Sequence, residues 1–104
     1  MILIIKIKDA IDLPAFWVVE TGRFHEMFVL RRNVQLAAYY EQTGDLVRRH
    51  DCLLEIFRIV KSLGEDHPSP QVHGLLATLT RELYRACRLI TERLQSLQAP
   101  RSVI

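Results

Sequence analysis

The sequence predicts a mainly all-α domain, built as a three-helix antiparallel up-down bundle, and three observations support this prediction. Apolar residues recur at helical spacing through most of the chain. Turn-forming residues divide it at Asp12–Pro14, Thr43–Asp45 and Gly64–Pro70. The 104 residues, of which 49% are hydrophobic and 25% charged, suffice for one packed core but not for two. We therefore expect a single helical domain over residues 1–104, completed by dimerisation.

Residues 1–12 form a short apolar segment whose secondary structure the sequence leaves open. Isoleucine and leucine crowd its first half, which favours a strand, whereas the spacing of Ile4, Ile7 and Ile11 also suits a helix. A lone strand would need a partner strand from another chain. Lys6 interrupts the run, which is too short to span a bilayer, and no basic residue precedes it as in a signal peptide. We therefore expect a cytoplasmic protein without membrane contact.

The first long helix is expected over residues 14–43, starting at either Pro14 or Arg23 because Gly22 can break the segment. Two apolar stripes lie on nearly opposite sides of this helix. The core stripe is Phe24, Met27, Leu30, Val34 and Ala38, and the second stripe is Val18, Val29, Leu36 and Tyr40. A helix that is apolar on two sides is usually sandwiched between neighbours. Three helices of one chain cannot cover both stripes, so this surplus of apolar surface predicts a partner.

The second stripe and the aromatic residues beside it form the predicted protein interface, because Trp, Tyr and Phe are enriched among interface anchors. The predicted interface consists of Trp17, Val18, Phe28, Val29, Leu36, Tyr39 and Tyr40. We expect Phe16, Phe24 and Phe57 in the core instead. A homodimer around a two-fold axis is the economical way to cover such a surface. The alternative is a monomer in which residues 1–20 are helical and fill the gap.

The second helix is expected over residues 45–63, with Asp45 as the N-cap and Gly64 as the stop signal. Its main apolar stripe is Leu46, Leu53, Ile56, Phe57 and Val60. Further apolar residues lie off this stripe, namely Val47, Leu54 and Ile59. This helix should therefore have more than one apolar contact surface.

The third helix is expected over residues 69–98, followed by a tail over residues 99–104. Ser69 can cap its start, with Pro70 at the first helical position. Its apolar residues fall within one narrow arc and are Val72, Leu75, Leu76, Leu79, Leu83, Ala86, Ile90, Leu94 and Leu97. The opposite face is polar and rich in arginine, which predicts an amphipathic helix with one buried side.

Arginine side chains support a second function class, a small nucleic-acid-binding regulator. The candidate residues are Arg48 and Arg49 in the second helix and Arg81, Arg85 and Arg88 on one face of the third. Arginine binds phosphate through two parallel hydrogen bonds, so such a stripe suits a nucleic-acid backbone. The net charge is only +2, however, which is too small to imply a polyanionic partner by itself. The alternative is a solvated face on which Glu82 and Glu92 pair with the arginines.

Catalytic and metal chemistry have weaker support. His67 and His73 flank Pro68-Ser-Pro70 in a loop that could supply metal ligands, and an enzyme or metal protein using this loop is the third function class. No HExxH, CxxC, GxSxG or glycine-rich phosphate motif is present, so we expect no catalytic residue, no metal and no cofactor. Cys52 and Cys87 are expected as buried free thiols. The favoured class is a non-catalytic interaction module, an adaptor, chaperone or regulatory subunit with a protein partner.

Overall fold

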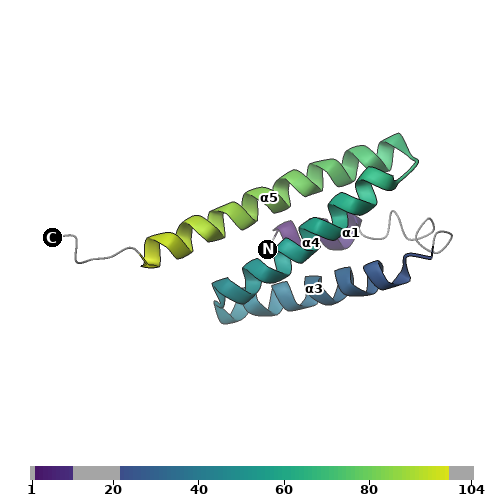
Figure 1. The fold of residues 1–104 in the computed structure, drawn as a ribbon. Coiled ribbons are helices and arrows are strands. Elements are labelled where there is room, and N and C mark those ends of the chain that lie inside the picture. The colour runs from purple at the N-terminus through teal and green to yellow at the C-terminus, as the bar shows by residue number, and fades with distance from the viewer. Residues whose placement is uncertain (1, 11–21, 99–104) are drawn as a thin grey trace.

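The computed structural model describes residues 2–10 and 22–98, and every element within them is an α-helix. The elements are α1 (Ile2–Ala10), α3 (Phe24–Thr43), α4 (Leu46–Asp66) and α5 (Pro70–Gln98) (Figure 1). The all-α class is therefore confirmed for this part of the chain. Within the N-terminal segment, whose secondary structure the sequence left open, residues 2–10 are helical. The predicted residues Phe16, Trp17 and Val18, and the tail over residues 99–104, lie outside the described residues.

α4 packs against α3 on one side and against α5 on the other. Short turns join α3 to α4 and α4 to α5, so neighbouring helices run in opposite directions (Figure 1). α1 contacts both α3 and α5 and is a fourth helix that the three-helix prediction did not include. No helix of the described residues is long and apolar enough to cross a membrane.

The turn between α3 and α4 follows from glycine and aspartate chemistry. Gly44 has a φ of 74°, in the left-handed region that favours glycine, and the amide of Asp45 donates to the carbonyl oxygen of Tyr40 at 3.0 Å. The carboxylate of Asp45 then accepts from the amide of Arg48 at 3.1 Å. Asp45 is thus the N-cap of α4, as its sequence context predicts. Upstream, Gly22 also has a positive φ, of 72°, and α3 begins just after it.

The end of α4 differs from the prediction, because the helix continues through Gly64 to Asp66. Gly64 is buried where α4 meets α5, and a Cβ atom there would lie 3.0 Å from the Cβ of Leu76. This glycine therefore allows two helices to approach closely and does not terminate the helix. Termination falls at His67, whose extended backbone (ψ of 132°) is the conformation favoured before a proline, here Pro68.

We expect Gly64→Ala to lower the free energy of unfolding by up to about 2 kcal/mol, because the new methyl group overpacks the contact with Leu76. The overpacking costs about 1–3 kcal/mol, and the gain of about 1 kcal/mol that alanine brings to a helix interior offsets part of this cost. Gly74 offers the matched control, since it lies in α5 with no atom within 4 Å of its ideal Cβ position. Gly74→Ala should therefore stabilise the fold. Urea unfolding monitored by circular dichroism would measure both changes, and equal stabilisation by the two would contradict the close contact.

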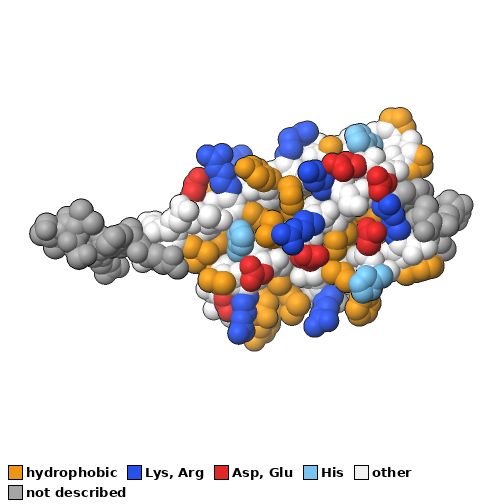
Figure 2. All heavy atoms as spheres, in the orientation of Figure 1, with side chains coloured by type: hydrophobic (Ala, Val, Ile, Leu, Met, Phe, Trp, Pro, Cys, Tyr) orange, Lys and Arg blue, Asp and Glu red, His pale blue; other side chains and the backbone are white. Residues whose placement is uncertain are grey.

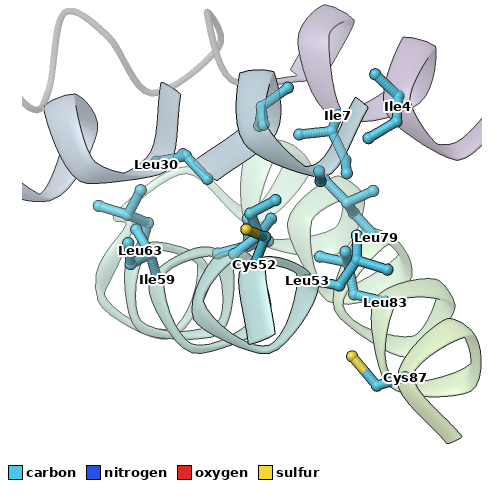
Figure 3. Close-up of a cluster of buried hydrophobic side chains, with 14 of the residues drawn as sticks. Ile4, Ile7, Leu30, Cys52, Leu53, Ile59, Leu63, Leu79, Leu83 and Cys87 are labelled. Carbon is cyan, nitrogen blue, oxygen red and sulfur yellow. The ribbon is translucent and has the colours of Figure 1, made fainter. Parts of the chain in front are cut away.

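The hydrophobic core draws residues from all four described helices. Its members are Ile4, Ile7, Met27, Leu30, Val34, Ala37, Cys52, Leu53, Ile56, Ile59, Val60, Leu63, Leu76, Leu79, Leu83, Cys87 and Ile90. Figure 3 shows Ile4 and Ile7 of α1 pointing toward the side chains contributed by the longer helices. Two positions of the predicted α5 stripe, Leu75 and Leu97, are exposed instead. Ile59, which the sequence pattern placed off the main stripe of α4, is buried.

Candidate functional site

The described residues of the predicted interface divide into two groups. Val29, Leu36 and Tyr40 are partly buried and pack against the core of their own chain. The guanidinium of Arg48 in α4 lies 5.8 Å from the ring centroid of Tyr40, so Tyr40 lies beside the start of α4. Much of the surplus surface expected from the sequence is thus covered within one copy of the chain.

The second group lies on the outward side of α3. Phe28 and Tyr39 are 64% and 58% exposed. Phe24, which was expected in the core, is also exposed, so that prediction was wrong. The buried arc of α3 runs through Met27, Leu30, Val34 and Ala37, and Phe24 lies outside it. We refer to Phe24, Phe28 and Tyr39 as the aromatic face.

The spacing along α3 explains why these rings share one side. Positions 28, 32, 35 and 39 follow each other at i, i+4, i+7 and i+11, so Arg32 and Gln35 lie between Phe28 and Tyr39. Both intervening side chains are exposed. The aromatic face is therefore a row of rings interrupted by one charged and one amide side chain. This mixture of aromatic residues with arginine is typical of protein–protein interfaces.

The predicted arginines of α4 have local roles. Arg48 is exposed, its Nε lies 3.6 Å from Oδ2 of the N-cap residue Asp45, and its guanidinium lies over the ring of Tyr40. Arg49 is partly buried and lines a hollow between α4 and α5. These two side chains therefore belong to different surroundings from the arginines of α5.

The predicted arginines of α5 share one exposed face. Arg81, Arg85 and Arg88 are all exposed, and Arg88 Nε lies 3.1 Å from Oε1 of Glu92. Glu82, the other expected partner, instead forms an ion pair with a lysine of α1. We refer to Arg81, Arg85 and Arg88 as the arginine face. Figure 2 shows both signs of charge interleaved with apolar side chains on the side of the molecule that it presents.

A shallow cleft of about 460 Å³ lies between α4 and α5. Its lining is His50, Leu54, Phe57, Tyr84, Cys87, Arg88, Thr91 and Glu92. The ring centroids of Phe57 and Tyr84 are 6.1 Å apart, and Phe57 is partly buried against the core. The hydroxyl of Thr91 donates to the carbonyl oxygen of Cys87, so Nε2–H of His50 donates to Thr91 at 3.3 Å. The bond between His50 and Thr91 joins α4 to α5, and most of the surface that lines the cleft is apolar.

The two thiols are buried and unreactive in character. Cys52 and Cys87 are free and each 7% exposed, as the sequence predicts. Burial raises the pKa of both thiols, and the nearby carboxylate of Asp51 raises that of Cys52 further. A nucleophilic cysteine needs the opposite shift. Neither thiol therefore offers a reactive site in the folded protein.

The raised thiol pKa values make the fold less stable in alkaline solution. Above the usual thiol pKa of 9.0, the unfolded chain releases these protons while the folded chain still holds them. The free energy of unfolding should therefore fall as the pH rises through this range. Urea unfolding at several pH values would show a steeper fall for the native sequence than for Cys52→Ala/Cys87→Ala. Identical pH profiles for the two proteins would contradict the burial of the thiols.

The histidines near the α4–α5 turn serve the turn itself. Nδ1 of His67 accepts from the amide of Ser69 at 3.0 Å. Nδ1–H of His73 donates to the carbonyl oxygen of Gly64, which helps to close the turn. Within residues 2–10 and 22–98, no group of three or more His, Cys, Asp or Glu side chains could hold a metal ion. The hydrogen bonds of His67 and His73 therefore stabilise the turn between α4 and α5.

The described residues thus form a small helical domain with an aromatic face on the outside of α3 and an arginine face on the outside of α5. No protein-family model, curated protein or solved structure matches this chain. The aromatic face was partly predictable, because Phe28 and Tyr39 fall outside the main apolar stripe. Phe24 was missed because its spacing to Met27 also suits the buried arc.

Proposed function

We propose that this chain is a non-catalytic helical interaction module that acts as a homodimer through the aromatic face of α3. One observation carries the proposal: three large aromatic side chains lie exposed on one side of a single helix. Exposed apolar groups of this kind usually mark a contact surface. In a two-fold dimer the same face of α3 serves both subunits.

The size of the aromatic face suits a weak or concentration-dependent dimer. With each ring more than half exposed, the three side chains present roughly 350 Å² of apolar surface. A standard interface buries about 800 Å² on each partner. The remaining area has to come from flanking polar residues such as Arg32 and Gln35. Arginine stacks favourably on aromatic rings, so Arg32 is compatible with such a contact.

Sedimentation velocity over a range of micromolar concentrations tests the proposal. We expect the native chain to shift from monomer toward dimer as the concentration rises. Phe28→Glu should shift the equilibrium to monomer, because it would bury a carboxylate against the partner's rings. Leu97→Glu is the matched control, since Leu97 is 60% exposed on α5, a helix that does not contact α3 among the described residues. A native chain that stays monomeric, or equal effects of the two substitutions, would contradict the proposal.

The arginine face supports a second candidate function, binding to a nucleic-acid backbone. Arg81 and Arg85 form no ion pair with the described residues, so their charge is available on the same exposed side of α5. Three phosphate contacts would give a slope of about −2.7 for the logarithm of affinity against the logarithm of salt concentration. Fluorescence anisotropy with a labelled duplex would measure this slope. Arg81→Glu/Arg85→Glu should abolish binding, whereas Arg48→Glu should leave most of it intact.

A further inference from the structure

One side of α5 carries a stripe of residues that begins where α1 contacts α5 and continues beyond that contact. Glu82, Ala86, Leu89 and Arg93 follow each other at i, i+4, i+7 and i+11, so they share one side of the helix. At the first of these positions, Oε1 of Glu82 lies 2.9 Å from Nζ of Lys6 in α1. The remaining three positions border a hollow of about 550 Å³. The hollow thus lies next to the surface that α1 contacts, nearer to the C-terminal end of α5.

The length of α1 explains why the hollow is open. α1 has nine residues and α5 has 29, which correspond to about 14 Å and about 43 Å of helix. α1 is therefore about a third as long as α5 and can cover only part of it. The full lining of the hollow is Leu46, Arg49, Ala86, Leu89, Ile90 and Arg93. We refer to it as the α4–α5 hollow.

The chemistry of the α4–α5 hollow is apolar with a positive edge. Ile90 is buried at 6% exposure, Ala86 and Leu46 are partly buried, and Leu89 is 56% exposed. Four of the six lining residues are thus aliphatic. The other two are arginines, and none of the described acidic side chains lines the hollow. Arg93 is exposed and forms no ion pair with the described residues. A complementary occupant needs an apolar face and carboxylates at its edge.

We propose that the α4–α5 hollow binds an acidic amphipathic helix of another protein, which lies end to end with α1 along α5. Such a helix would repeat the pattern by which α1 docks, with aliphatic side chains in the groove and an ion pair at its border. The sign of the ion pair is reversed, because Arg93 takes the place that Glu82 has beside α1. The α1 of a second copy is a poor occupant, since Lys6 and Lys8 carry the same charge as Arg93.

This surface is separate from the proposed dimer contact. The hollow is lined by α4 and α5, whereas the aromatic face belongs to α3. The two proposals can therefore fail independently. Phe28→Glu should leave binding at the hollow unchanged, and substitution of Arg93 should leave the monomer–dimer equilibrium unchanged.

The test uses the full chain and two synthetic peptides of about four helical turns. The first peptide has leucine along one face and glutamate along both edges, and the second has lysine in place of every glutamate. Fluorescence anisotropy should show binding of the acidic peptide and at least about tenfold weaker binding of the basic one. Binding of the acidic peptide should also weaken as salt is added. Equal affinity for both peptides, or binding of neither, would overturn the proposal.

Variants of α5 show whether the acidic peptide binds in the hollow. Arg93→Glu should weaken binding about tenfold, because it replaces an attraction by a repulsion. Arg81→Glu makes the same change of charge on the arginine face and should alter affinity less than about twofold. Circular dichroism would check that both variants remain folded, as expected for exposed positions. Equal weakening by both variants would place the peptide elsewhere, and loss of self-association in Arg93→Glu would assign the hollow to a second copy. Either result overturns the proposal.

Discussion

Leu83→Ala should lower the free energy of unfolding by about 2–5 kcal/mol. Leu83 is 0% exposed in the middle of α5, on the side that faces the core. The substitution removes buried methyl groups and leaves a cavity that the surrounding helices fill only in part. Alanine is an excellent helix former, so the loss comes from packing and not from helix propensity. Because small domains are stable by only about 5–15 kcal/mol, urea unfolding should show a large shift of the midpoint.

Leu97→Ala provides the control for this experiment, because it makes the same chemical change near the end of the same helix. Leu97 is 60% exposed. Its substitution should change the free energy of unfolding by less than about 0.5 kcal/mol. The sequence pattern placed Leu83 and Leu97 in the same buried arc, so the pair tests the structure directly. Similar losses for both variants would contradict the exposure of the end of α5.

Helix α5 shows how much of the buried surface of a helix can be predicted from apolar periodicity. Its apolar residues fall in one arc, and those near the middle of the helix, such as Leu79, Leu83 and Ile90, are buried as expected. Leu75 and Leu97, near its two ends, are exposed. Periodicity identifies the buried side of a helix, but the extent of burial along the helix depends on where its neighbours begin and end.

Helix α3 was harder to interpret, because it has apolar residues on several sides. From the sequence, Val29, Leu36 and Tyr40 were predicted to form surplus apolar surface, on the assumption that each helix buries one face. In the fold, α3 contacts both α4 and α1, so these side chains are partly buried within one chain. Which stripe is covered depends on the positions of neighbouring helices. The sequence of α3 alone does not contain this information.

The α4–α5 hollow could not be predicted from any single segment. Its walls come from the start of α4 and the second half of α5, and it is open because α1 is short. The register between α4 and α5 is fixed by contacts such as that of Gly64 with Leu76 and that of His50 with Thr91. A sequence pattern gives the face of each helix but not this register. Of the two arginines of the hollow, Arg49 was identified as a candidate and Arg93 was not, and the position of both at one hollow follows only from the fold.

Ile7→Ala should lower the free energy of unfolding by about 2–3 kcal/mol, because it removes most of a fully buried side chain from the short helix α1. Ile7 is 0% exposed, whereas Ile5 of the same helix is 56% exposed and faces away from the core. Ile5→Ala therefore makes the same change of side chain at the same place in the chain without loss of packing. It should change the stability by less than about 0.5 kcal/mol.

The sequence allowed two ways of covering the apolar surface, by the N-terminal residues of the same chain or by a second copy. This pair of variants distinguishes between them. If α1 completes the bundle of its own chain, Ile7→Ala loosens α1 and exposes the side chains beneath it, so backbone amides of α1 should exchange faster in deuterium-exchange experiments. The apolar surface that α1 normally covers would then promote self-association, which sedimentation velocity would detect. Equal and small effects of Ile5→Ala and Ile7→Ala would mean that α1 does not stabilise the chain. In that case the surface beneath α1 would be available to a partner, as a bundle completed by dimerisation requires.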